Sequence, residues 1–82
     1  MTAPIRLYGA EWCADCHRAR EFLTRRQVPF EWVDVDQDEE AVRTVELLSH
    51  GSRRLPTLAF PDGSVLVEPS DADLARKLGL VA

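Results

Sequence analysis

The spacing of apolar residues along this chain alternates between the two-residue repeat of a strand and the 3.6-residue repeat of a helix. Of all the sequence features, this alternation most restricts the folds that the chain can adopt. Residues 5–8, IRLY, alternate apolar and polar side chains and end at Gly9, which is typical of a short strand. Residues 14–26 repeat apolar side chains at helical spacing, and residues 30–36 are rich in aromatic and β-branched residues. The first part of the chain therefore predicts a β-α-β unit.

The second half of the chain predicts a helix, a hairpin and a last helix. A helical pattern begins near Asp38, with acidic residues in its first turn, and stops near Gly51. Residues 57–60 and 64–67 read as two strands, and the turn sequence PDG between them makes the strands antiparallel. Ser70, followed three residues later by Asp73, resembles a capping box, and Gly79 ends the helix that this box would start.

These elements follow the order β-α-β-α-β-β-α, which is an α/β arrangement. The first two strands are joined by a crossover helix, so we expect them to pair in parallel with a right-handed connection. The hairpin is expected to extend the same sheet, giving a four-stranded mixed sheet flanked by three helices on its two faces. The 82 residues are predicted to form a single domain over residues 1–82.

Charge and cysteine content narrow the classes of function. Fourteen acidic residues against ten basic ones give a net charge of -4, so the surface would repel phosphate and no nucleic acid is expected as a partner. No signal-peptide pattern and no membrane-spanning stretch is visible, so we expect a cytoplasmic protein with no membrane partner. In a reducing compartment, two nearby cysteines indicate redox or metal chemistry rather than a structural disulfide.

Cys13 and Cys16 have the C-x-x-C spacing of dithiol redox sites and lie between the first predicted strand and the first predicted helix. Cys13 is expected at or near the helix N-cap, where free N–H groups and the helix dipole stabilise a thiolate. Cys16 falls one turn later on the apolar side of the helix, so we expect it to be shielded. Thiol-disulfide exchange needs this asymmetry, because one thiolate attacks and a second thiol resolves the mixed disulfide.

Charged neighbours complicate the environment of Cys13. Glu11 and Asp15 place negative charge on either side of it and oppose a thiolate, whereas His17 would offset them when protonated. We expect the helix N-terminus to prevail over the two acids.

The cysteines also leave other interpretations open. With His17 they form C-x-x-C-H, the spacing that attaches a c-type haem, although Met1 and His50 are the only methionine and second histidine available as an axial ligand. A structural zinc site would need both cysteines and both histidines, with His17 directly after Cys16, which makes a tetrahedral arrangement awkward. Two unreactive core cysteines are a third interpretation, which fits a helix N-terminus poorly.

The chain resembles the glutaredoxin family of the thioredoxin superfamily over nearly its whole length. The segments that carry the resemblance are YGAEWCADC, FEWVDVD, RRLPTLAFPDGS and PSDADLARKL, in the order expected for that family. The details of these segments look most like the mycoredoxin-type subgroup of bacteria that use thiols other than glutathione. The resemblance implies a thioredoxin-like fold, a redox-active Cys13-x-x-Cys16 and no metal or organic cofactor.

The resemblance also implies roles for residues outside the cysteine motif. Pro56 would be a cis-proline facing the active site, and the backbone of Leu55 would pair with the peptide-like part of a bound thiol. Ser70 and Asp71 match the positions that hold a carboxylate of that thiol at a helix N-terminus, although Ser70 is equally explained as a helix cap. Trp12 would be a partly exposed apolar wall beside the nucleophile.

Two positions depart from the usual glutaredoxin pattern. Many members carry a lysine three residues before the nucleophile, where this chain has Ala10, and a Gly-Gly pair where this chain has Glu68-Pro69. Both changes disfavour glutathione and leave room for another small thiol, so the candidates for the reductant are glutathione, mycothiol, bacillithiol or another such thiol. Arg53 and Arg54 are candidates to replace the missing positive charge, or they belong to a solvated basic loop.

The sequence therefore predicts a thiol-disulfide oxidoreductase that reduces mixed disulfides between proteins and a low-molecular-weight thiol. Its expected partners are that thiol and oxidised or S-thiolated proteins, and the protein is expected to act as a monomer. One alternative is a thioredoxin-like dithiol electron donor that is recycled by a flavoprotein reductase. A second alternative is a non-catalytic binding module whose partner responds to the redox state of the two cysteines.

Overall fold

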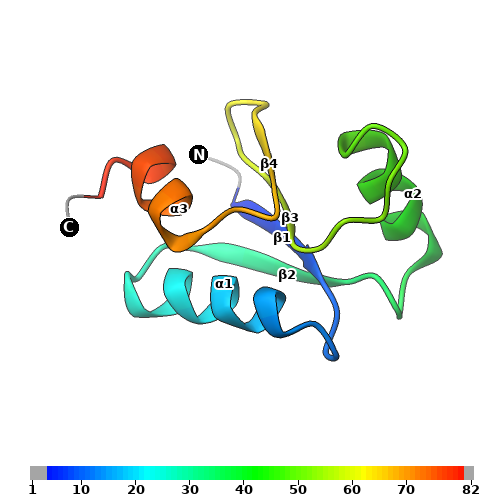
Figure 1. Ribbon diagram of the computed structural model, residues 1–82, viewed down its shortest axis with the longest axis horizontal. Coiled ribbons are helices and arrows are strands. Elements are labelled where there is room, and N and C mark those ends of the chain that lie inside the picture. Colours follow the sequence, from blue (N-terminus) through cyan, green and yellow to red (C-terminus); the bar gives the residue numbers. More distant parts are fainter. Residues whose placement is uncertain (1–3, 81–82) are drawn as a thin grey trace.

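Strand β1 (Ile5–Gly9) is an inner strand of a four-stranded sheet with the order β2-β1-β3-β4. It pairs in parallel with β2 (Phe30–Asp34) and antiparallel with β3 (Thr57–Ala59), which pairs antiparallel with β4 (Val65–Val67). The computed structural model describes residues 4–80 and is shown in Figure 1. The predicted element order and mixed sheet are confirmed.

The helices cover both faces of the sheet, as predicted. Helices α1 (Ala14–Arg25) and α3 (Asp71–Leu78) pack on one face, whereas α2 (Glu39–Leu48) packs on the other (Figure 1). No helix within residues 4–80 is both long and apolar enough to cross a membrane. The core on the side of α1 and α3 contains the buried residues Ile5, Leu7, Ala19, Leu23, Leu58, Phe60 and Leu74, and the core on the side of α2 contains Tyr8, Ala41 and Val45.

Side chains cap the start of each helix. The Asp38 carboxylate accepts hydrogen bonds from the first-turn N–H groups of α2. At the start of α3, the Ser70 hydroxyl accepts from the N–H of Asp73, and the Asp73 carboxylate accepts from the N–H of Ser70. This reciprocal capping box satisfies two donors that the helix itself leaves unpaired, and it confirms the predicted start of α3. The cap of α1 is Cys13, which belongs to the site.

Some element boundaries differ from the prediction. Strand β2 ends at Asp34, two residues early, because the Asp34 carboxylate accepts the N–H of Asp36 and turns the chain. Helix α2 ends at Leu48, before the expected stop, because His50 and Gly51 both have positive φ, of 58° and 91°. Such a conformation cannot continue a right-handed helix.

Candidate active site

Cys13 is the N-cap residue of α1, where the sequence places it. Its Sγ accepts a hydrogen bond of 3.1 Å from the N–H of Cys16, the kind of contact that stabilises a thiolate at a helix N-terminus. The side chain is more enclosed than expected, because only 8% of Cys13 is exposed. It lies in a cluster with Ala10 and Cys16, against which Val35 and Leu55 pack.

Cys16 is fully buried on the inner side of α1, as predicted. Burial, together with a hydrogen bond between the Cys16 thiol and the Cys13 side chain, raises the pKa of Cys16 to about 12, because both favour the neutral thiol. Both cysteines are free thiols in this structure. Cys16 therefore stays protonated at neutral pH.

The two acids beside Cys13 are each paired with an arginine of α1. One carboxylate oxygen of Glu11 lies 3.5 Å from a terminal nitrogen of Arg20. Oδ1 of Asp15 lies 3.7 Å from Nε of Arg18. The negative charges that the sequence places around Cys13 are thus offset by side chains one turn or more along the same helix.

Both ring nitrogens of His17 contact other groups of the chain. Its Nδ1 lies 2.6 Å from a terminal nitrogen of Arg20, and its Nε2 lies 2.6 Å from the carbonyl oxygen of Glu11. Because a guanidinium can only donate, Nδ1 must accept, and Nε2 must carry the proton that it donates to the carbonyl. Both ring nitrogens are occupied in this way, so His17 offers no free nitrogen to a haem iron or to zinc.

Arg20 also stacks on an aromatic side chain of β2. Its guanidinium carbon lies 4.0 Å from the centre of the Trp32 ring, a cation–π contact. The ring of His17 lies 6.3 Å from that of Trp32, at an interplanar angle of 27°. The turn that carries Glu11 is thereby fixed to α1 and to the sheet.

The loop before β3 packs against the cysteines. The peptide bond between Leu55 and Pro56 is cis, as predicted, and Leu55 contacts the cluster that contains Cys13 and Cys16. The carbonyl of Pro56 accepts the N–H of Glu68, and the carbonyl of Arg54 accepts the hydroxyl of Thr57. No described residue within 4–80 hydrogen-bonds to the backbone of Leu55. Its N–H and carbonyl therefore have no hydrogen-bond partner among the described residues.

The start of α3 carries Ser70 and Asp71, and α1 reaches it through Arg18. The Arg18 guanidinium donates to Oδ1 of Asp71 at 2.6 Å and to the carbonyl of Pro69 at 2.9 Å. The Ser70 hydroxyl is engaged in the capping box. Arg18 therefore links the predicted anion-binding position at the start of α3 to α1, the helix that carries Cys16. The sequence pattern shows only that Arg18 lies on the polar side of α1.

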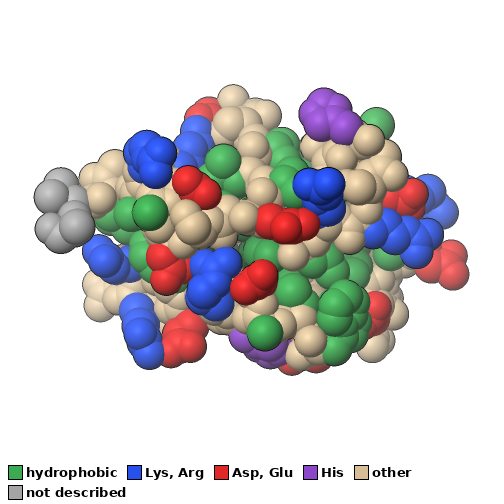
Figure 2. Space-filling view, viewed as in Figure 1, with side chains coloured by type: hydrophobic (Ala, Val, Ile, Leu, Met, Phe, Trp, Pro, Cys, Tyr) green, Lys and Arg blue, Asp and Glu red, His purple; other side chains and the backbone are tan. Residues whose placement is uncertain are grey.

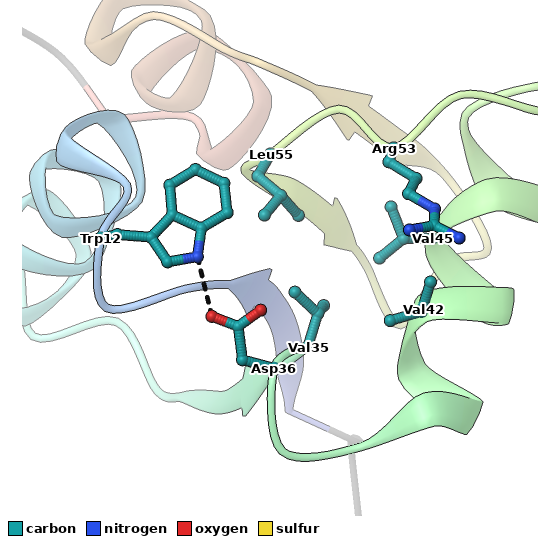
Figure 3. Close-up of a pocket in the computed structure, with 7 residues that line it drawn as sticks. All are labelled: Trp12, Val35, Asp36, Val42, Val45, Arg53 and Leu55. Carbon is teal, nitrogen blue, oxygen red and sulfur yellow. Dashed lines mark hydrogen bonds between the residues drawn. The ribbon is translucent and has the colours of Figure 1, made fainter.

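Trp12 lies beside a small pocket on the α2 side of the cysteines. Its side chain is 72% exposed, and its indole N–H donates to the Asp36 carboxylate at 2.7 Å (Figure 3). The pocket has a volume of about 200 Å³. It is lined by Trp12, Val35, Asp36, Val42, Val45, Arg53 and Leu55.

The two departures from the glutaredoxin pattern have clear structural settings. Ala10 is fully buried beside Cys13, so the site holds no cation at that position. Glu68 adopts a positive φ of 51°, a backbone conformation that favours glycine. The carboxylate of Glu68 lies 4.0 Å from Nε of Arg54, and that of Glu46 lies 3.4 Å from Nε of Arg53. Neither of these arginines is a free cation.

Sequence reasoning missed Arg18, Arg20 and Asp36 as parts of the site. Arg18 and Asp71 are 53 residues apart, and Trp12 and Asp36 are 24 residues apart. Their local patterns are those of a solvated helix face and an acidic turn, so only the arrangement of the elements brings these pairs together.

Fold and site together define a class of protein. A parallel β-α-β unit whose helix begins with C-x-x-C, against which a cis-proline loop packs, is the arrangement of thioredoxin-fold thiol-disulfide oxidoreductases. The glutaredoxin family model matches residues 5–65. The chain belongs to the glutaredoxin family, and it is a thiol-disulfide oxidoreductase like its relatives.

Individual relatives agree with this assignment. The chain is 33% identical over 82 residues to a Mycobacterium tuberculosis protein named as a candidate glutaredoxin, covering 100% of this chain and 98% of the relative. It is 31% identical over 78 residues to mycoredoxin 1 of Corynebacterium glutamicum, covering 95% and 96% of the two chains. A glutaredoxin structure from Methanosarcina mazei superposes with a TM-score of 0.81 at 28% identity, covering 95% of this chain and 80% of that one.

Proposed function

We propose that this protein reduces mixed disulfides between proteins and a low-molecular-weight thiol, with Cys13 as the nucleophile. The observation that carries the proposal is the difference between the two cysteines. Cys13 caps α1 and accepts an N–H at its sulfur, whereas Cys16 is fully buried with a raised pKa. This difference gives one sulfur that can attack and one that remains a thiol until a disulfide forms beside it.

The first step transfers the small thiol from the protein substrate to the enzyme. The Cys13 thiolate attacks the sulfur of the small thiol, the substrate's disulfide breaks, and the substrate leaves as a thiolate that takes up a proton. A second molecule of small thiol then attacks the new disulfide, which releases a symmetric disulfide of the small thiol and restores Cys13. In the alternative second step, Cys16 displaces the small thiol and forms the Cys13–Cys16 disulfide, which two further molecules of small thiol reduce.

The residues around the cysteines support a bound thiol in this position. The unpaired backbone of Leu55, beside cis Pro56, is available to a peptide-like group. Ser70 and Asp71 begin α3, whose first-turn N–H groups favour an anion. Trp12 directly precedes Cys13, and Arg54 directly precedes Leu55 in the loop before β3. No metal or organic cofactor takes part in this scheme, and we propose that the protein acts as a cytoplasmic monomer with a single domain.

The charges of the site support a small thiol other than glutathione. Glutathione carries two carboxylates, and its capture by a protein relies on cations. Here Ala10 occupies the position of the usual lysine, and Arg18, Arg53 and Arg54 are each paired with a carboxylate of the chain. A thiol whose recognition depends less on carboxylate–arginine contacts fits this site better.

Substitution of each cysteine tests the proposal. Cys13→Ser is expected to abolish reduction of an S-thiolated protein, because serine is not a nucleophile towards disulfides. Cys16→Ser is expected to retain turnover by the route that uses a second small thiol. Activity is measured as release of the small thiol from an S-thiolated protein, and an active Cys13→Ser protein would refute the assignment.

The Cys16→Ser variant also separates the alternatives. A thioredoxin-like dithiol donor needs Cys16 in every turnover, so loss of all activity in this variant would favour that function. A binding module would show almost no turnover of any model disulfide in the unsubstituted protein. Mass spectrometry of Cys16→Ser, isolated from its own cells, identifies the small thiol attached to Cys13.

A further inference from the structure

The pocket beside Trp12 shares two of its walls with the cysteine cluster. Val35 and Leu55 line the pocket and also pack against Cys13 and Cys16. Figure 3 shows Trp12 and Leu55 on one side of the pocket and the α2 residues Val42 and Val45 on the other. A group attached to the sulfur partner of Cys13 therefore has an apolar pocket within its immediate reach.

The open wall of this pocket is held in place before any substrate arrives. Trp12 is 72% exposed, yet its indole N–H is bonded to Asp36 on the turn after β2. An exposed aromatic ring fixed by a hydrogen bond loses little freedom when a ligand packs against it. Figure 2 shows hydrophobic side chains gathered on this face, between the start of α1 and α2.

Size and lining indicate what the pocket accepts. Its volume of about 200 Å³ lies below the roughly 300 Å³ at which pockets for whole small molecules begin. The polar groups at its rim are engaged, Asp36 with Trp12 and Arg53 with Glu46. An apolar pocket of this size fits one aliphatic side chain.

The turn that borders the pocket carries unpaired negative charge. None of the acidic residues between positions 34 and 40 forms an ion pair with a basic side chain of residues 4–80. Three of them, Asp38, Glu39 and Glu40, are accounted for by the N-terminus of α2, and Asp36 binds Trp12. The negative charge of these acids nevertheless remains on the surface, because none of them is paired with a cation of residues 4–80. Arg53, on the opposite rim, is itself paired with Glu46. A basic segment complements this turn.

We propose that this pocket, lined by Trp12, Val35, Val42, Val45 and Leu55, is a specificity site for protein substrates. It takes a bulky aliphatic side chain next to the substrate cysteine, and the acidic turn favours a lysine or arginine close to that side chain. The inference rests on the proposed function, because the cysteine of the bound segment must react with Cys13.

Symmetric disulfides of short peptides test this site. In a single turnover, the reduced dithiol enzyme converts one such disulfide into two peptide thiols and becomes the Cys13–Cys16 disulfide, so electrons and protons balance. The peptides differ only in having leucine before the cysteine, leucine after it, or glycine at both positions, each with a nearby lysine or glutamate. 2-Hydroxyethyl disulfide serves as a substrate too small to reach the pocket.

One of the two leucine peptides is expected to react about tenfold faster than the glycine peptide, as is usual for filling an apolar subsite. Val42→Phe, which fills the pocket from a half-buried position of α2, is expected to bring this ratio close to one. Leu47→Phe adds a ring to the same helix outside the pocket, at a residue that is 80% exposed, and is expected to leave the ratio unchanged.

Substitutions of Asp36 distinguish the effect of the Trp12 wall from the effect of the negative charge. They also test the site independently of whether Val42→Phe folds. Asp36→Ala releases Trp12 and is expected to lower the preference for leucine. Asp36→Asn keeps an acceptor for the indole, so it should keep that preference and reduce the preference for lysine over glutamate. The lysine preference should also weaken as salt is added.

The outcomes distinguish the proposed function from the specificity site. No reduction of 2-hydroxyethyl disulfide would count against the proposed function itself. Reduction of that compound with equal rates for all peptides would overturn the specificity site alone. The site would also be wrong if Val42→Phe weakened only the reaction with a small-thiol mixed disulfide, or if sedimentation showed a dimer of the wild-type chain that Val42→Phe abolished.

Discussion

At the scale of single residues, two chemically identical thiols have different environments because of their positions in the fold. Cys13 sits at the N-cap, and its sulfur accepts an N–H, whereas Cys16 is enclosed by the core of α1 and β2. The acids that flank Cys13 are offset by Arg18 and Arg20 on the same helix. The arginines therefore place positive charge beside both of the carboxylates that flank Cys13.

The raised pKa of Cys16 predicts a loss of stability in alkali. The folded state keeps this thiol protonated up to a pKa of about 12, whereas the unfolded chain releases the proton near pH 8.5. The stabilisation is complete below that lower pKa and is lost as pH rises towards the upper one, by about 1.4 kcal/mol for each pH unit between them. Urea unfolding of the reduced protein between neutral pH and pH 10.5 measures this slope, which Cys16→Ala should reduce; an equal slope in both proteins would contradict the prediction.

At the scale of elements, the end of β1 lies close against both β2 and α1. A Cβ atom at Gly9 would lie 2.6 Å from Cη2 of Trp32, closer than such atoms approach one another, and 3.0 Å from Cβ of Cys16, which is a tight contact. Glycine at this position therefore allows the strand that leads into the cysteine loop to pack against the helix of the cysteines. Because the same ring supports Arg20, the packing of β2 also fixes the loop of Glu11.

We expect Gly9→Ala to lower the free energy of unfolding by about 1–3 kcal/mol, the usual cost of overpacking. The cost should fall when Trp32 is replaced by leucine, because the far end of the ring is the nearest obstacle. A double-mutant cycle with Trp32→Leu, followed by urea unfolding, measures this coupling. Equal costs of Gly9→Ala in the two backgrounds would show that the contact does not carry the effect.

At the scale of the whole molecule, ion pairs join parts of the chain that are distant in sequence. Arg18 ties α1 to the start of α3, and Lys77 ties α3 to the turn between β3 and β4 through Asp62, at 2.6 Å. Both contacts hold α3, whose start carries Ser70 and Asp71, to neighbouring elements. Such pairs on the surface contribute modestly to stability, but they orient the elements that carry the site.

The pair of Asp62 and Lys77 predicts a loss of stability in acid. Lys77 and the contacts with Ser64 lower the pKa of Asp62 well below its ordinary value, so the folded state holds this carboxylate ionised more strongly than the unfolded chain does. The stabilisation is present above the ordinary aspartate pKa of about 3.9 and is lost as pH falls through the folded pKa. Thermal unfolding between neutral pH and pH 2.5 should show a shallower acid dependence for Asp62→Asn, and an unchanged dependence would count against this pair.

The sequence by itself determined the order of the elements and the position of the cysteines in that order. Apolar periodicity, the PDG turn and the Ser70 cap are local signals, because the spacing of neighbouring residues decides whether a segment can bury one face as a helix or a strand. The position of Cys13 at a helix start follows from the same local pattern, and so does the inward position of Cys16. The cis peptide bond before Pro56 was predicted from the resemblance to glutaredoxins.

Only the tertiary structure decided which charges meet and where a pocket forms. Arg18 reaches Asp71 and Trp12 reaches Asp36 because separate elements converge at the ends of the sheet strands, and no local pattern records that convergence. The contacts of His17 likewise depend on Arg20 and the carbonyl of Glu11 meeting its two ring nitrogens. Long-range contacts depend on the crossover geometry and on the packing of whole helices. The spacing of neighbouring residues does not reveal these long-range contacts, which are visible only in the folded structure.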